Sequence, residues 1–171
     1  FQTNSKQAEK LYELIKKEAD LKGNEIIYDL YCGTGTIGIY LSEKAKKVFG
    51  FEIISSAIDD AIINASDNNV KNTLFFKGDI KDILIDNKEI LIIEKPDISI
   101  VDPPRAGLHP KALKNILKLN QKKIIYISCN PSTQARDLKS IVEYGYKIKN
   151  VIPVDMFPHT PHIESVVTLI K

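Results

Sequence analysis

Cysteine is scarce in this sequence, in which Cys32 and Cys129 are the only two among 171 residues. Two cysteines can form neither a disulfide framework nor a four-cysteine zinc site, so the classes of small protein that depend on such staples are excluded. Free cysteines are typical of a reducing compartment, and we therefore expect a cytoplasmic protein.

The sequence also lacks a large excess of charge of either sign, because it has 24 lysines and arginines and 22 aspartates and glutamates, which gives a net charge of +2. This balance gives no strong field for binding a polyanion, although a local basic face for nucleic acid remains compatible with it. The sequence has no signal-peptide pattern and no apolar run long enough to span a bilayer, so we expect no membrane partner.

Repeats, low-complexity tracts and linkers are also absent, and the length suffices for one hydrophobic core. We therefore expect a single domain over residues 1–171, and a monomer. Because the chain begins with Phe1 rather than with methionine, we expect it to be a fragment of a longer protein.

Predicted strands and helices alternate along most of the chain. Apolar runs rich in β-branched residues predict the strands, and apolar residues at helical spacing predict the helices. Such alternation is typical of a mostly parallel sheet with helices on both faces, whereas the last two strands, separated only by a loop, should pair antiparallel. The predicted strands are one that begins at Glu25, then 47–52, 74–76, 97–105, 122–128, 147–156 and 165–170. The first predicted helix is capped by Asn4 or Ser5 and ended by Gly23; others begin at about Gly35, span 55–68 and 110–119, and begin at Pro131. In the helix 55–68 we expect Ile58, Ala61, Ile62 and Ala65 to point inward. Residues 80–95 stay ambiguous.

The residues that follow the predicted strands are the unusual ones. In open sheets of this kind, ligands bind beyond the carboxyl ends of the strands. The sequence therefore predicts a binding site at that edge of the sheet, made by residues 31–36, Glu52, Asp79, residues 102–105 and Cys129.

A glycine-rich turn links the first of these strands to a helix, with Gly33, Gly35 and Gly38 in a GxGxxG pattern and Glu52 at the end of the next strand. The turn lets the backbone approach a nucleotide, and a carboxylate placed as Glu52 is can hold the two ribose hydroxyls. This predicts nucleotide binding without deciding between a dinucleotide and S-adenosylmethionine. Asp79 is a candidate ligand of an adenine amino group, although a solvated loop acid explains it nearly as well.

The segment Asp102-Pro103-Pro104-Arg105 closes a buried strand. Two prolines stiffen the turn and aim the acid at its start into the cleft. A stiff turn alone is one explanation. A methyltransferase that holds a planar base against its methyl donor is another, whereas a dinucleotide dehydrogenase has no evident use for the turn.

Cys129 lies where the strand 122–128 gives way to a helix that begins at Pro131. The macrodipole and the free backbone N–H groups of a helix N-terminus favour a thiolate, so we expect a lowered pKa and a nucleophilic thiol. The alternative is a small buried apolar side chain at a strand end.

The loop before the last strand contains His159, His162 and Glu164. Their spacing fits no zinc pattern, so we expect no metal. A glutamate near a nucleophile can instead act as a general base.

Five segments together resemble the RNA uracil-5-methyltransferases that make 5-methyluridine. The resemblance spans the whole chain in the expected order, and its most specific parts are the SCNP segment and the final HxE. The segments are FQTN (1–4), DLYCGTGTIG (29–38), DPPRAGLHP (102–110), SCNP (128–131) and PHTPHIES (158–165).

This resemblance implies a Rossmann-like class I methyltransferase fold, an α/β structure with a mostly parallel seven-stranded sheet whose last strand is antiparallel. It implies S-adenosylmethionine as cofactor and RNA, ribosomal or transfer, as substrate. By position, Cys129 matches the nucleophile and Glu164 the proton acceptor, while Asp102 and Arg105 orient the cofactor and the uracil edge. The cofactor-side residues are Gln2, Tyr31, Glu52, Asp79 and Asp102, with Gly33 and Thr36 beside them in the turn.

Three other functions stay open on the sequence alone. An amino-group methyltransferase acting on DNA or RNA has an acidic-Pro-Pro turn that normally ends in an aromatic residue, where this chain has Arg105. A NAD-binding dehydrogenase uses the same glycine turn. A non-catalytic RNA-binding domain would keep the fold without needing Cys129 or Glu164.

Overall fold

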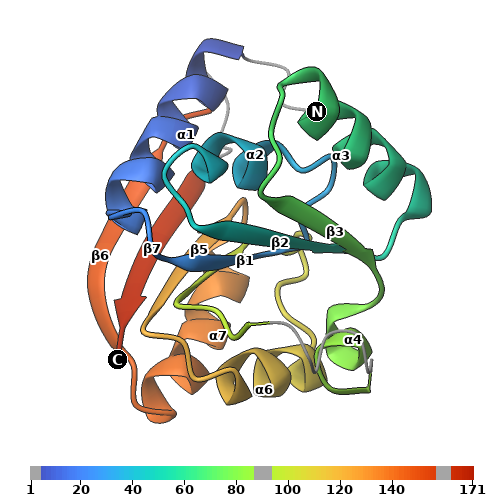
Figure 1. Cartoon of the computed structure of the whole chain (residues 1–171). Helices are drawn as coiled ribbons and strands as arrows, with labels where there is room; N and C mark the ends of the chain where they lie inside the picture. Colours follow the sequence, from blue (N-terminus) through green and yellow to red (C-terminus); the bar gives the residue numbers. More distant parts are fainter. Residues whose placement is uncertain (1–4, 87–93, 157–162) are drawn as a thin grey trace.

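A computed structural model describes residues 5–86, 94–156 and 163–171 (Figure 1). Gln2, His159 and His162 lie outside the described residues. None of the described helices is long and apolar enough to cross a membrane. The helices are α1 (Ser5–Ala19), α2 (Thr36–Ser42), α3 (Ser55–Asp67), α4 (Ile80–Asp86), α6 (Pro110–Lys118) and α7 (Pro131–Glu143). The strands are β1 (Ile26–Leu30), β2 (Lys47–Glu52), β3 (Thr73–Lys77), β4 (Ile98–Val101), β5 (Lys123–Ser128), β6 (Lys147–Val154) and β7 (Glu164–Ile170).

The seven strands form one sheet in the order β3-β2-β1-β4-β5-β7-β6. The first five run parallel, and β7 lies between β5 and β6 and runs antiparallel to both. The chain passes from β1 outward to β3 and then returns to β4 on the other side of β1, which opens a crevice at the carboxyl ends of the central strands. The predicted fold class and the antiparallel pairing of the last two strands are confirmed.

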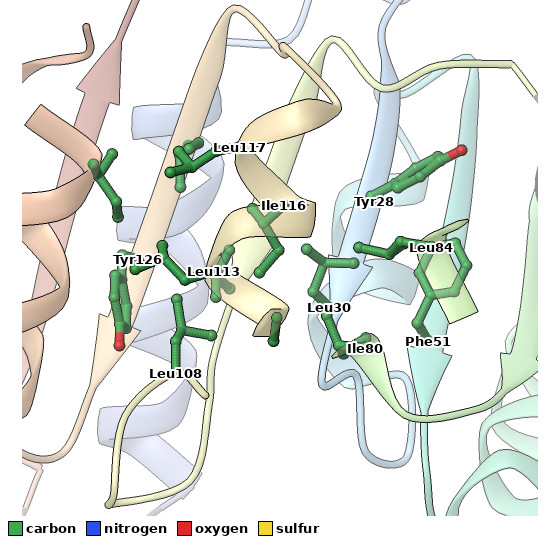
Figure 2. Packing of buried hydrophobic residues seen from close by; sticks show 14 of the residues in the cluster. Tyr28, Leu30, Phe51, Ile80, Leu84, Leu108, Leu113, Ile116, Leu117 and Tyr126 are labelled. Atoms are coloured by element: carbon green, nitrogen blue, oxygen red, sulfur yellow. The ribbon is translucent and has the colours of Figure 1, made fainter. Parts of the chain in front are cut away.

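Each face of the sheet carries its own hydrophobic core. Figure 1 shows α1, α2 and α3 on one side of the sheet and α4, α6 and α7 on the other. Leu11, Ile15 and Leu41 pack against the first face, together with the strand residues that alternate toward it. On the second face, Leu113, Ile116 and Leu117 of α6 point toward the strands among the side chains drawn in Figure 2. Strands covered on both sides are apolar at nearly every position, which is why unbroken apolar runs identified them in the sequence.

Two details of the helices differ from the sequence prediction. Helix α1 ends at Ala19 rather than at Gly23, because Asp20 adopts a left-handed conformation and the Lys123 ammonium donates to the carbonyls of Glu18 and Ala19. The inward orientation predicted for Ile62 is wrong, since its side chain is 53% exposed. Helix α3 covers the end of the sheet near β3, where the buried stripe is only as wide as Ile58, Ala61 and Ala65.

A buried carboxylate of α1 is hydrogen-bonded to β6 and β7, at one end of the sheet. Glu18 is only 7% exposed, and its Oε2 accepts hydrogen bonds from Thr168 Oγ1 of β7 at 2.6 Å and from Asn150 Nδ2 of β6 at 2.7 Å. This contact fixes α1 against β6 and β7, and its loss would leave buried hydrogen-bond donors without an acceptor.

We expect Glu18→Ala to lower the free energy of unfolding by about 1–3 kcal/mol, because Thr168 is left with a buried, unsatisfied hydroxyl. Urea denaturation measures the change. The control is Glu13→Ala, an exposed position on the same helix, where the change should stay within about 0.5 kcal/mol. Equal effects of the two substitutions would contradict a special role for Glu18.

Candidate active site

The glycine turn between β1 and α2 is held from below by Asp29. Gly33 and Gly35 have φ angles of 53° and 77°, the left-handed region that glycine adopts without strain. Asp29 is 1% exposed, and its Oδ2 accepts the Gly38 N–H at 2.8 Å. Its Oδ1 is buried without a hydrogen-bond partner among the described residues. Burial raises the pKa of Asp29 to about 7, despite the Gly38 hydrogen bond.

Glu52, at the end of β2, holds the same turn from the side. Its Oε2 accepts the Gly33 N–H at 3.1 Å, and its Oε1 accepts the N–H groups of Ile53 and Ile54 at 2.8 and 3.0 Å. Tyr31 sits at the start of the turn with a φ of 66°, a conformation that costs a non-glycine residue free energy and is concentrated at functional sites. The two acids thus fix the conformation of the turn.

Two cavities meet at the carboxyl edge of the sheet and share Tyr31 and Asp102. The first, of about 480 Å³, lies between α1 and the glycine turn and is lined among others by Asp29, Gly33 and Thr36. The second, of about 360 Å³, is lined by Glu52, Ile53, Ile54, Asp79 and Pro104. Together they form an elongated cleft with the turn in its middle. The predicted residues Tyr31, Gly33, Thr36, Glu52, Asp79 and Asp102 all line it.

Cys129 and Glu164 are brought together by strand register. The antiparallel ladder of β5 and β7 ends with Ser128 opposite Ser165, so the next residues along the two strands are Cys129 and Glu164. Cys129 is exposed, whereas Cys32 is buried beneath the glycine turn. Glu164 is half-buried, and burial raises its pKa. An exposed thiol therefore lies beside a carboxylate with a raised proton affinity.

The expectation of a lowered pKa at Cys129 is wrong. Its pKa is raised, first by burial and next by the Glu164 carboxylate, with Asp102 adding to the effect and Arg105 opposing it. A backbone hydrogen bond that favours the thiolate is outweighed by these effects, and Asn130 caps α7 by accepting the Ser132 N–H at 3.1 Å. Cys129 thus stays a thiol until a cation offsets the carboxylates or a base removes its proton.

The turn 102–105 lies against the start of α7, next to Cys129. The Arg105 carbonyl accepts from Asn130 Nδ2 and from Thr133 Oγ1, both at 3.2 Å. The pKa of Asp102 is raised to about 7 by burial, then by Glu164 and Asp29. Asp102 therefore faces both the cleft and the cysteine, and the exposed, positively charged Arg105 lowers the pKa of Cys129 in opposition to it.

Gln2, the remaining predicted cofactor residue, is outside the described part of the chain. Among the described residues, no group of three potential ligands gathers to hold a metal ion. Asp29 was not predicted as a site residue, although the sequence contains a signal for it. An acid inside an apolar strand, immediately before the glycine turn, is buried and needs a hydrogen-bond partner there.

Solved methyltransferases share this Rossmann-like fold. The precorrin-6y C5,15-methyltransferase of Geobacter metallireducens superposes with a TM-score of 0.75 over 95% of this chain and 89% of that one, at 11% identity, a likeness of fold alone. The tRNA (uracil-54, C5)-methyltransferase of Pyrococcus abyssi, solved with S-adenosyl-L-homocysteine, gives 0.84 at 39% identity over 99% of this chain and 40% of that one.

A family model of the tRNA (uracil-5-)-methyltransferases matches residues 1–171, and the chain belongs to this family. A Bacteroides thetaiotaomicron protein named as an RNA methyltransferase is 50% identical over 99% of this chain, and a Clostridium tetani protein of the same name is 48% identical over 99%. The chain spans 37% and 36% of the length of these two relatives. The family inferred from the five sequence segments is confirmed.

The buried Asp29 should make stability depend on pH. Its pKa rises from 3.8 to about 7 on folding, so the folded state favours the protonated form and loses stability as pH increases between these values. Asp29→Asn cannot ionise. We therefore expect its unfolding free energy, relative to the wild type, to increase from pH 4 to pH 7 and to level off above. Urea denaturation across that range measures this, and a constant difference would contradict the raised pKa.

Proposed function

We propose that the protein transfers a methyl group from S-adenosylmethionine to carbon 5 of a uridine in RNA, through a covalent bond between Cys129 and carbon 6 of the uracil. The observation that carries the proposal is the strand register that sets Cys129 opposite Glu164, close enough to interact electrostatically with Asp102, which lines the cleft. Membership of the family and the likeness to the Pyrococcus abyssi enzyme support it.

The cleft suits this cofactor in shape and charge. Its two cavities lie on either side of the glycine turn, as an elongated ligand with an adenosine end and an amino-acid end requires. In this proposal Glu52 accepts from the ribose hydroxyls, and Asp79 from the adenine amino group. At the other end, Asp29 and Asp102 line the larger cavity, where a cationic amino group and sulfonium would meet their carboxylates.

The bound cofactor supplies an electrophilic methyl group, but carbon 5 of uracil is a poor nucleophile. The Cys129 thiolate makes carbon 5 nucleophilic by forming a bond to carbon 6, because the electron pair of the 5,6 double bond then becomes available at carbon 5. The cation in the cleft and Arg105 both oppose the carboxylates that raise the pKa of Cys129. The thiolate is therefore favoured once the cofactor is in place.

Glu164 completes the reaction. After methyl transfer carbon 5 holds both a hydrogen and the new methyl group, and the hydrogen has to leave as a proton. Glu164 accepts that proton, the electron pair re-forms the double bond, and Cys129 is expelled as a thiolate. A carboxylate whose pKa is raised by burial is better matched to this task than a solvated one.

Transfer RNA is the substrate that the family description and the Pyrococcus abyssi enzyme favour. The target base has to be unstacked to reach the cleft, at a cost of a few kcal/mol. An amino-group methyltransferase or a non-catalytic RNA-binding domain would have no use for an exposed cysteine opposite a half-buried glutamate, so these alternatives are less well supported.

Binding of S-adenosyl-L-homocysteine should raise the melting temperature by mass action on the folded state, with a stabilisation of about 2.7 kcal/mol at 100 times the Kd. Glu52→Ala should lose most of this ligand-induced shift, measured against the variant's own melting temperature. The exposed Asp59→Ala on α3 should keep it. A full shift in Glu52→Ala would mean that Glu52 does not bind the ribose.

Glu164→Gln, in the full-length protein, should stall after methyl transfer, because glutamine keeps the shape of glutamate but cannot accept the proton. RNA should stay bonded to Cys129, survive denaturing electrophoresis and carry tritium from a labelled methyl donor. Turnover should fall by about a hundredfold to ten-thousandfold, the usual contribution of general base catalysis.

The control for that experiment is Cys129→Ala, which should bind the cofactor and form neither adduct nor product. Turnover of Glu164→Gln near the wild-type rate would assign the proton to another base. A variant that binds cofactor yet forms no adduct would place Glu164 before methyl transfer and contradict the proposed order.

A further inference from the structure

Helix α7 carries two buried polar side chains that the proposed chemistry does not use, Gln134 and Asp137, at 2% and 3% exposure. Gln134 Nε2 donates to the carbonyls of Tyr126 and Ser165, at 3.0 and 3.1 Å. It therefore ties the helix to β5 and to β7, at the residue that follows Glu164. Asp137 is bonded in the opposite direction, toward the loop that follows Asp102.

The Asp137 carboxylate joins three segments of chain. Its Oδ2 accepts the Leu108 N–H at 2.8 Å and the Tyr126 hydroxyl at 2.7 Å, and its Oδ1 accepts Nε and Nη2 of Arg136 at 2.9 and 2.8 Å. Figure 2 shows the side chains of Leu108 and Tyr126 in the same apolar cluster. The carboxylate thus accepts four hydrogen bonds and links the loop to β5 and α7.

Arg136 extends the same contact outward. Its Nη2 also donates to the carbonyls of Ala106 and Leu108, at 3.1 and 3.3 Å. Between them lies Gly107 with a φ of 77°, where an added Cβ would stand 2.7 Å from both Arg136 Nη2 and Asp137 Oδ2. The loop therefore approaches the Arg136–Asp137 pair as closely as its backbone allows, which requires glycine at this position.

The beginning of the loop is held by the same helix. Asn130 and Thr133 donate to the Arg105 carbonyl, and Gly107 N–H closes the turn onto the carbonyl of Pro104 at 2.8 Å. Backbone groups of the loop 104–108 are thus hydrogen-bonded to side chains of α7 and of its cap. Because α7 begins two residues after Cys129, the helix sets where the turn 102–105 stands relative to that thiol.

We propose that Arg136 and Asp137 are positioning residues, which hold the loop 105–108 so that Asp102 and Arg105 face Cys129 in the geometry that thiol addition requires. The inference deepens the proposed uridine methylation and rests on it. A displacement of about 1 Å away from the chemistry can cost a hundredfold in rate, so a clamp on the loop backbone is a sensitive control of the reaction.

Stability alone does not account for this arrangement. Arg136 is 57% exposed, and an ion pair open to solvent on one side contributes little to the free energy of folding. Burying the carboxylate of Asp137 carries a desolvation cost that an apolar side chain of similar size would avoid. What the charged pair provides and an apolar pair cannot is direction, because its hydrogen bonds fix the orientation of Ala106 and Leu108.

The test uses tRNA that contains 5-fluorouridine, with S-adenosylmethionine and the full-length protein. Fluorine replaces the hydrogen that Glu164 would remove, so the methylated adduct on Cys129 persists and its rate of formation is measured by denaturing electrophoresis. In Asp137→Asn the amide cannot accept from both Arg136 and Leu108 as the carboxylate does. We expect adduct formation to slow by about a hundredfold, while the melting-temperature shift caused by S-adenosyl-L-homocysteine is retained.

Two further variants separate positioning from stability. Arg136→Gln changes an exposed side chain, leaves the bonds of Asp137 to Leu108 and Tyr126 in place, and should still slow the adduct by at least tenfold, about 1.4 kcal/mol. Tyr126→Phe removes the hydrogen bond from β5 to Asp137 and leaves the bonds of Asp137 to Leu108 and Arg136 in place. It should lower the melting temperature while adduct formation stays near the wild-type rate.

Adduct formation at the wild-type rate in both Asp137→Asn and Arg136→Gln would overturn the inference and leave the proposed function standing. Equal slowing in Tyr126→Phe would also overturn it, because the network would then act through general stability. No adduct with the wild-type protein would overturn the proposed function itself, and the inference with it.

Discussion

The antiparallel pairing of β7 with β5 is the constraint on which the arrangement of the site depends. Parallel strands bring their carboxyl ends to one edge of the sheet, whereas an antiparallel partner brings its first residues to that same edge. Here the ladder fixes Ser128 opposite Ser165, and the last residues before the edge are thereby matched one to one. Cys129 directly follows β5 and Glu164 begins β7, so backbone hydrogen bonds, rather than loop conformation, set these two residues opposite each other.

Much of this structure was predictable because it follows from local pattern. Strands buried on both faces show as unbroken apolar runs, and the loops between them are short, so the order of elements was read correctly from β1 to β7. The same logic located the site, since polar residues such as Glu52, Asp79 and Asp102 directly follow apolar runs and therefore stand at the carboxyl edge. The pairing of Cys129 with Glu164 was given by family resemblance, and the structure supplies its geometry.

What could not be predicted depends on residues far apart in the sequence. The rise in the pKa of Cys129 comes from burial and from Glu164, 35 positions away on another strand, whereas the sequence shows only the adjacent helix start. Ile62 was misplaced because helical spacing gives the stripe of a helix but not the width of the surface that it covers. Asp137 looked like an ordinary helix residue, and only the fold brings the backbone of Leu108 onto it.

The raised pKa of Cys129 affects how this thiol reacts with oxidants. Oxidants and electrophilic metabolites react with thiolates far faster than with thiols, and exposed cysteines of low pKa are the ones that reach the sulfenic and sulfinic states. Cys129 is exposed, and burial together with the carboxylates of Glu164 and Asp102 raises its pKa, so the thiol form is favoured over the thiolate. These carboxylates therefore lower the reactivity of an exposed cysteine toward oxidants.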